Sequence, residues 1–327
     1  MRTLGYIGAV FGLTLLVVLA LRTDLPAMLH SLAVGGWPLL WLVPYRALYF
    51  LLYAIGWWVM LQPYDVLRRA GLAYVFWVTT VREGIDRLLP VASVGGGVAG
   101  VRLMRWRGLA GASVGATVIA EILLTLIVSY AFTALGLLLL LQVHSAGEQF
   151  HRLFLAFALS LPAPVIILWL LRHGSVFQRL EHFLRPLVDA NALTEGASSL
   201  DRELRATLRR WRKLGTAGCL QFLALLMGSF EVWFALRLFG HPVGSGTALI
   251  LESMTQTMRH LAFVVPAGLG VQEATLVLFG HALGLNGELA LAVSMAKRLR
   301  EVLCGLPALI SWQWMEGRRL HASSAGG

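Results

Sequence analysis

The sequence predicts an all-α polytopic membrane protein with about six full transmembrane helices and two re-entrant broken-helix hairpins, arranged as an inverted repeat. Composition is the first observation: 13% of the 327 residues are charged and 57% are hydrophobic, whereas a soluble domain is usually about a quarter charged. Secondly, several runs approach or exceed the roughly 20 apolar residues that cross a bilayer. Thirdly, proline and glycine clusters interrupt two further apolar regions, 72–104 and 246–283.

Six apolar runs are long enough to be full spans: about 4–21, 38–61, 112–142, 150–171, 214–239 and 287–315. The first is expected to be an uncleaved span, because its apolar core is longer than that of a signal peptide and no small-x-small cleavage site follows. Tryptophans stand near several run ends, where amphipathic rings favour the membrane interface: Trp37, Trp41, Trp57, Trp58, Trp312 and Trp314.

The polar stretch 173–213 divides the chain into an N-terminal membrane half, 1–172, and a C-terminal half, 214–327. It is expected to form two short amphipathic helices joined by the loop "NALTEGASS", residues 191–199. Because basic residues mark the cytoplasmic side, this linker and both termini are predicted to be cytoplasmic. The net charge of +10 then reflects topology and attraction to anionic lipid. A nucleic-acid partner is not expected, because the basic residues are scattered without a reading motif.

The two interrupted regions resemble each other. The first reads "REGIDRLLPVASVGGG" (82–97) and the second "RHLAFVVPAGLG" (259–270). In each, an arginine begins an apolar turn, a proline follows and glycines come soon after. The flanking spans run in opposite directions, which is the layout of an inverted repeat with substrate at the midplane. Backbone groups freed at the breaks must lie in protein or line a wet cavity, because lipid offers them no hydrogen bonds.

A half-helix that begins after Gly97 or Gly270 points a partly positive N-terminus at such a cavity, which suits a phosphate or carboxylate. Glu273 falls in the first turn of the second half-helix. Two roles stay open for it: complementing the helix dipole, or binding substrate or a proton.

Ionisable residues inside the apolar runs predict a polar interior. Lys297, Arg298, Arg300 and Glu301 lie near the middle of the last span. At about 100° per residue they spread over roughly 160° of the helix circumference, too wide for one neighbour to cover. A lipid-facing position would cost at least about 2.5 kcal/mol per charge near the bilayer centre. These side chains must therefore meet acids, water or a ligand.

We rank the cations and breaks around Glu273 as a lipid-headgroup site, lined by Arg82, Arg87, Pro90, Arg259, Pro266, Gly268, Gly270, Glu273, Lys297, Arg298 and Arg300. The expected buried-charge partners are Arg46, Glu121, Glu231, Glu252 and Glu301. The alternative is a set of structural ion pairs. Candidates are Lys297 with Glu301, one helical turn apart, Arg46 with Glu121, and Arg259 with Glu252.

Other motifs in the sequence lack the structural context that their usual functions require. Gly95, Gly97 and Gly100 match a G-x-G-x-x-G pattern, but no strand precedes them, as a dinucleotide site requires. The histidines show no metal-binding spacing, and both cysteines lie in apolar runs. No cofactor, metal site or catalytic residue is therefore expected.

The chain contains the motifs "DRLLP" (86–90) and "PAGLGVQEA" (266–274). These motifs resemble those of the lysylphosphatidylglycerol synthase transmembrane family, which includes the flippase portion of multiple-peptide-resistance proteins. The likeness covers essentially the whole chain, and residues 81–108 are most similar to the hopanoid-biosynthesis-associated branch. The chain departs from the family pattern at Gln272, where arginine is usual, and the 173–213 stretch is too short for an aminoacyl-transfer domain.

The resemblance implies a bacterial inner-membrane protein that translocates lipids, with anionic or polar-headgroup membrane lipids as partners. We therefore expect a flippase that uses a basic midplane cavity, and not an enzyme. One alternative is an intramembrane enzyme acting on an isoprenoid-phosphate or hopanoid lipid, which would need a metal site or an acid–base pair. Another is a non-catalytic scaffold whose partners are lipid-biosynthesis proteins.

Overall fold

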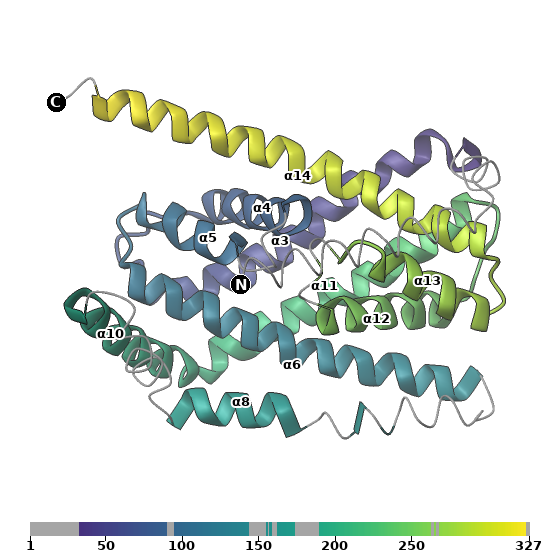
Figure 1. Cartoon of the computed structure of the whole chain (residues 1–327), viewed down its shortest axis with the longest axis horizontal. Helices are drawn as coiled ribbons and strands as arrows, with labels where there is room; N and C mark the ends of the chain where they lie inside the picture. Colours follow the sequence, from purple (N-terminus) through teal and green to yellow (C-terminus); the bar gives the residue numbers. More distant parts are fainter. Residues whose placement is uncertain are drawn as a thin grey trace. The chain divides into compact units, whose positions relative to one another are not determined.

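The computed structural model describes residues 33–89, 95–143, 155, 157–158, 162–173, 190–262, 265 and 268–324. Within these residues all regular structure is helical and no strand occurs (Figure 1). The elements are η1 (Trp37–Trp41), α3 (Leu42–Leu61), α4 (Leu72–Leu88), α5 (Gly95–Arg105), α6 (Gly111–Val143), α8 (Pro162–His173), α10 (Ala190–Leu208), α11 (Trp211–Leu238), α12 (Ser245–Leu261), α13 (Val271–Ala282) and α14 (Gly287–Ser324).

Three segments of the described chain are helical, long and apolar enough to cross a membrane: Trp37–Leu61, Gly111–Gln142 and Trp211–Leu238. They match the expected spans 38–61, 112–142 and 214–239. The expected span 287–315 lies inside α14, a continuous helix of 38 residues whose middle is charged. The span 4–21 lies outside the described residues, and of 150–171 only residues 155, 157–158 and 162–171 are described, the last within α8. The count of six crossings therefore stays a prediction.

The chain folds into two compact units that alternate along the sequence. The first comprises the described parts of Met1–Leu51, Phe76–Gly96 and Leu226–Gly327, and the second those of Leu52–Val75 and Gly97–Leu225. The predicted membrane halves, 1–172 and 214–327, are divisions along the sequence and stay a prediction.

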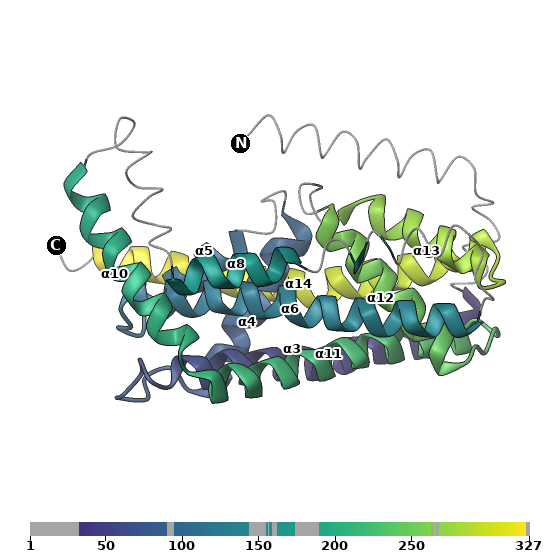
Figure 2. The same cartoon turned by 90° about the horizontal axis from the view of Figure 1, so that it is seen from below.

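In the second unit, α10 packs on α6, and α8 lies beside both (Figure 2). Ala116, Ala120 and Leu123 of α6 form a buried cluster with Leu204 and Leu208 of α10. The expected loop "NALTEGASS" is wrong, because residues 191–199 belong to α10. This segment contains no proline and only one glycine, and alanine, leucine and glutamate favour a helix.

In the first unit, glycines let two helices approach closely. A Cβ atom on Gly84 of α4 would lie 3.1 Å from the carbonyl oxygen of Gly305 in α14. On the same face, Trp77 Nε1 donates a hydrogen bond to Ser311 Oγ at 2.9 Å. The two helices therefore meet through backbone at Gly84 and Gly305, and this contact holds the charged middle of α14 beside α4.

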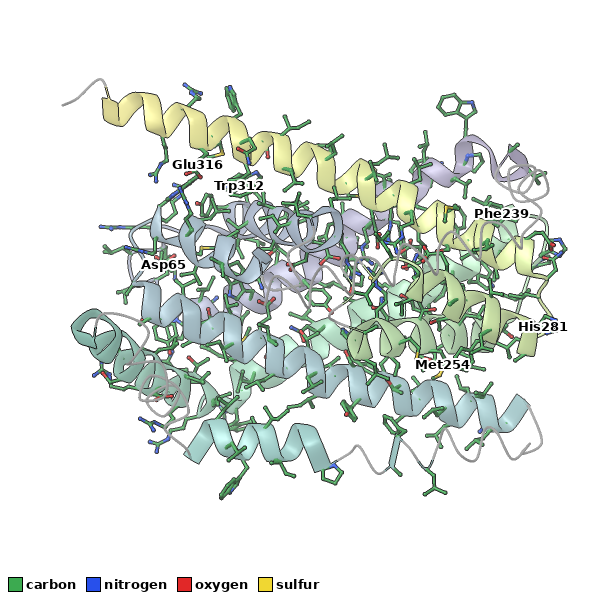
Figure 3. All side chains as sticks on the ribbon, viewed as in Figure 1. Asp65, Phe239, Met254, His281, Trp312 and Glu316 are labelled. Atoms are coloured by element: carbon green, nitrogen blue, oxygen red, sulfur yellow. The ribbon has the colours of Figure 1, made fainter. Side chains whose placement is uncertain are left out.

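Both interrupted regions form a helix, a break and a second helix. The first break separates α4 from α5, which begins at Gly95 and so starts earlier than the expected position after Gly97. The second separates α12 from α13, and here the expectation is right, because Gly270 precedes the first residue of α13. Helices α12 and α13 pack side by side, and Met254 and His281 mark them in Figure 3. Their re-entrant placement in a membrane, and the inverted repeat, stay predictions.

Candidate functional site

Lys297 of α14 is neutralised by a neighbouring helix. Its Nζ atom donates to Glu252 Oε2 of α12 at 2.5 Å, and both side chains are at least 97% buried. The other oxygen of Glu252 accepts a hydrogen bond from Gln256 Nε2 at 2.8 Å. Lys297 therefore pairs with Glu252 of a neighbouring helix and not with Glu301 of its own helix, which was the alternative. The same contact corrects the expected pair of Arg259 with Glu252, because Lys297 binds that carboxylate.

Arg298 ties α14 to the second break. Its Nε atom lies 3.1 Å from Glu273 Oε1, and its Nη1 atom lies 3.2 Å from Glu301 Oε2. Its Nη2 atom donates to the carbonyl oxygen of Gly268 at 3.0 Å. Gly268 has a positive φ of 60°, which favours glycine. One guanidinium therefore binds both the backbone of the break and the acid that follows it.

Glu301 joins three arginines. Its Oε1 atom lies 3.2 Å from Arg259 Nη1 and 3.8 Å from Arg300 Nη2, while its Oε2 atom binds Arg298. Arg259 also donates to Gln272 Oε1 at 2.6 Å. Because one carboxylate serves three guanidinium groups, none of the three is fully neutralised by Glu301 alone.

A polar relay links Arg259 to Glu273. Gln272 accepts from Arg259 and donates through Nε2 to Ser294 Oγ at 2.9 Å. Ser294 in turn donates to Glu273 Oε1 at 3.0 Å. The other oxygen of Glu273, Oε2, is buried and has no hydrogen-bond partner among the described residues. A buried acceptor without a hydrogen bond is exceptional. A favourable interaction with the dipole of α13 therefore does not fully explain why a glutamate stands at position 273.

Arg300 extends the set of ion pairs toward α3 and α4. Its Nη1 atom donates to Glu231 Oε2 of α11 at 2.8 Å. Arg46 of α3 lies 3.9 Å from the same carboxylate oxygen and 3.3 Å from Glu83 Oε1 of α4. Glu83 also binds Arg87, one helical turn later, at 2.8 Å. The Arg46 guanidinium lies 3.6 Å from the centroid of the Tyr49 ring, which shields it on one side.

These contacts join into one network, which we call the arginine–glutamate network. Among the described residues it contains five arginines and four glutamates, Arg46, Arg87, Arg259, Arg298, Arg300, Glu83, Glu231, Glu273 and Glu301. Its formal net charge is +1. All of it lies in the first compact unit.

The sequence profile of the lysylphosphatidylglycerol synthase TM region matches residues 6–307. The chain belongs to this family. No curated protein and no solved structure matches the chain. As a member of the lysylphosphatidylglycerol synthase TM family with helices of spanning length, it is a multi-pass membrane protein with a lipid-related function.

The charged residues of this family member differ in their access to solvent or lipid. The side chains of Arg87 and Arg298 are 20% and 16% exposed, whereas those of Lys297 and Arg300 are 3% exposed. A cavity of about 10 Å³ lies between Arg46, Arg87 and Arg300. A water needs roughly this much room, so this cavity is too small for a lipid headgroup.

The N-terminus after the first break is already bound by a carboxylate of the chain. Asp86 Oδ1 of α4 accepts the backbone N–H of Gly96 in the first turn of α5 at 2.9 Å. A side chain on Gly96 would collide with Asp86 Oδ2. The glycine at this position therefore admits the carboxylate, which occupies the place that the sequence suggested for an anionic ligand.

The structure gathers most of the predicted site. Arg87, Arg259, Glu273, Lys297, Arg298 and Arg300 lie together, and Gly268 and Gly270 frame the second break. Arg82 is on α4 of the same unit, whereas Glu121 is buried on α6 of the second unit. Arg46 pairs with Glu83 and Glu231, and its pairing with Glu121 stays a prediction. Pro90 and Pro266 lie outside the described residues.

Sequence reasoning missed Glu83, Gln272 and Ser294 as members of the site. Glu83 stands four residues before Arg87, a spacing that signals a helical ion pair, and this signal was available. Gln272 attracted notice only as a departure from the family pattern. Ser294 is a small polar residue in an apolar helix, and nothing in its local sequence distinguishes it from a serine bonded to its own helix.

Proposed function

We propose that the protein moves lipids with polar, preferentially anionic, headgroups between the two leaflets of a bacterial inner membrane. The arginine–glutamate network carries this proposal, because its net charge of +1 would fall to zero when it binds a headgroup with one negative charge. Family membership supports a lipid as the substrate. Phospholipids and acidic polar hopanoids both fit the headgroup chemistry, and the cytoplasmic placement of both termini is part of the proposal.

The headgroup would first meet Arg87 and Arg298, the two most exposed cations of the network. Guanidinium binds phosphate in the same two-pronged geometry as carboxylate. A phosphate can therefore replace Glu273 on Arg298 without leaving this cation unpaired, and Glu273 would keep the hydrogen bond that Ser294 donates to it. The carboxylates act as internal substitutes that hold the arginines while no lipid is bound.

Opening of the second break would admit the headgroup. Helices α12 and α13 form a hairpin whose break has positive φ at Gly268 and Gly270. The contact of Arg298 with the Gly268 carbonyl oxygen holds this break against α14. When a phosphate engages Arg298, that contact is released and the hairpin is free to move. Movement of a broken-helix hairpin around a midplane site is the general logic of transporters with repeated folds.

Leaflet exchange in proteoliposomes tests the proposal. Fluorescent phosphatidylglycerol would be reconstituted with the purified protein, and a membrane-impermeant quencher would report the outer-leaflet fraction over time. We expect Glu273→Gln to reduce the initial rate of exchange at least about tenfold. The reason is that Glu273 binds Arg298 while no headgroup is bound there, and the substitution removes its negative charge. The matched control is Glu288→Gln, at the start of α14 and outside the described network.

Equal rates for the wild type and Glu273→Gln, with both proteins folded, would remove Glu273 from the mechanism. Chromatography of the recovered lipid completes the test. A changed headgroup would indicate an intramembrane enzyme, and an unchanged lipid with no protein-dependent exchange would favour the scaffold alternative.

A further inference from the structure

An aromatic groove lies at the start of α3 and beside α11, within the first unit. Its volume is about 450 Å³, inside the usual range of small-molecule sites. Its lining residues are mainly aromatic and apolar, and their polar groups are one carboxylate, one phenol and two indole N–H groups: Trp41, Leu42, Pro44, Tyr45, Phe230, Glu231, Trp233 and Phe234. Trp41 and Phe230 are 69% and 58% exposed. In a membrane protein, such rings face lipid or the interface.

The polar atoms of the residues that line this groove differ in whether they have a hydrogen-bond partner. The Tyr45 hydroxyl donates to the carbonyl oxygen of Met227 at 2.7 Å. Glu231 is 2% exposed, and its Oε2 atom receives Arg300. Its Oε1 atom is buried without a hydrogen-bond partner among the described residues. A buried acceptor in this state costs stability unless a donor reaches it, and Glu231 is one of the residues that line the groove.

The surrounding charges select the kind of donor. Glu231 is held by Arg300 and lies near Arg46, and the network that it belongs to already has a net charge of +1. An ammonium group would add a second positive charge to this network, whereas a hydroxyl would donate a hydrogen bond without changing the charge. The walls offer apolar surface to the rest of the molecule. A free water could supply a donor, but it would leave the apolar walls unfilled.

We propose that this groove binds an apolar lipid alcohol, with the hydroxyl group donating to Glu231 Oε1 and the hydrocarbon body packed against the aromatic walls. Because Glu231 also pairs with Arg300, an occupied groove touches the same network that would bind an anionic headgroup. The groove therefore extends the proposed transport function: a lipid alcohol bound there would influence the network through Glu231 without entering it.

Photo-crosslinking at equilibrium tests the groove separately from transport. The full chain in nanodiscs would be crosslinked with a diazirine-bearing diacylglycerol and competed with unlabelled diacylglycerol or its methyl ether, which has no hydroxyl donor. Removing Glu231 itself would strand Arg300 and risk misfolding, so the donor is removed from the ligand. We expect the alcohol to compete about fivefold better than the ether, the effect of one hydrogen bond.

The protein variants use two tryptophans of the same 3-10 helix. Trp41 lines the groove, whereas Trp37 is 84% exposed and does not line it. We expect Trp41→Ala to lower the crosslinking yield severalfold and Trp37→Ala to leave it unchanged. Equal competition by alcohol and ether would overturn the hydrogen bond to Glu231, and equal yields from the two variants would overturn the groove as the site. Loss of leaflet exchange with intact alcohol preference would instead overturn only the transport function.

Discussion

The pair of Lys297 with Glu252 shows how this chain buries two charges between helices α14 and α12. Its Nζ–Oε2 distance is 2.5 Å and both side chains are almost fully buried. Removing one member leaves an uncompensated buried charge, which is expensive, whereas replacing both by uncharged groups of similar shape is often tolerated. The pair therefore stabilises the fold only as a unit.

Lys297→Met should lower the free energy of unfolding by about 3 kcal/mol, because Glu252 would remain charged without its partner. The double variant Lys297→Met/Glu252→Gln should recover most of this loss. Thermal unfolding of the detergent-solubilised chain, followed by tryptophan fluorescence, would compare the three proteins. A single variant as stable as the wild type would show that Glu252 finds another partner or becomes protonated.

The neighbours of Gln272 explain why a neutral residue fits at this position. Its amide oxygen accepts from Arg259 and its amide nitrogen donates to Ser294. Gln272→Arg would place a second guanidinium beside Arg259, whereas Gln272→Glu would keep the acceptor. We expect the arginine variant to unfold at a lower temperature than the glutamate variant, by several degrees. The reverse order would contradict the orientation assigned to Gln272.

For individual residues, the sequence predicted that the buried charges need ion-pair partners, but it did not predict which residues those partners are. The wide angular spread of Lys297, Arg298 and Arg300 required several neighbours, and the structure supplies them from α11, α12 and α13. Which acid meets which cation depends on how those helices pack, and a single sequence contains no record of that. Local spacing suggested Glu301 for Lys297, but a helix one layer away presents Glu252 instead.

At the scale of elements, the second break is the part that the proposed mechanism needs to move. Gly268 has positive φ, and a Cβ atom there would lie 3.3 Å from Arg259 Nε. The chain contains a matched glycine at Gly284, whose φ is 83° and whose Cβ would meet nothing within 4 Å. Comparing alanine at the two positions separates backbone strain from interference with the network.

Gly268→Ala should slow leaflet exchange severalfold more than Gly284→Ala, because only the first side chain would press on Arg259 of the network. Both should lose similar stability from the positive φ, roughly 1 kcal/mol. Exchange rates in proteoliposomes and unfolding temperatures in detergent would be measured on the same preparations. Equal exchange rates for the two variants would indicate that the break does not move during transport.

The glycine and proline clusters were sufficient to predict where helices stop. The second half-helix begins directly after Gly270, as expected, while α5 begins at Gly95 because Asp86 accepts the Gly96 amide. That carboxylate comes from a different helix, so its capping role was invisible in the local sequence. The expected loop at 191–199 failed for a related reason: α10 packs on α6, and this packing rewards a continuous helix.

For the whole molecule, composition alone indicated a helical membrane protein, and three expected spans coincide with helices long and apolar enough to cross. The division into two compact units could not be predicted, because each unit combines segments that are far apart in the chain. The ion pairs of the network follow the first of these units and not the order of the sequence. A buried network with a net charge of +1 is the property from which the proposed function follows.

Above all, we propose that this network passes anionic headgroups across the membrane. The most direct measurement is the initial rate of leaflet exchange catalysed by wild-type protein for two fluorescent lipids with identical chains, phosphatidylglycerol and phosphatidylcholine, in the same liposomes. We expect the protein to accelerate exchange of both lipids relative to protein-free liposomes, and to accelerate exchange of the anionic lipid several times more than that of the zwitterionic one. Folded protein that accelerates neither lipid, or that prefers the zwitterionic one, would contradict it.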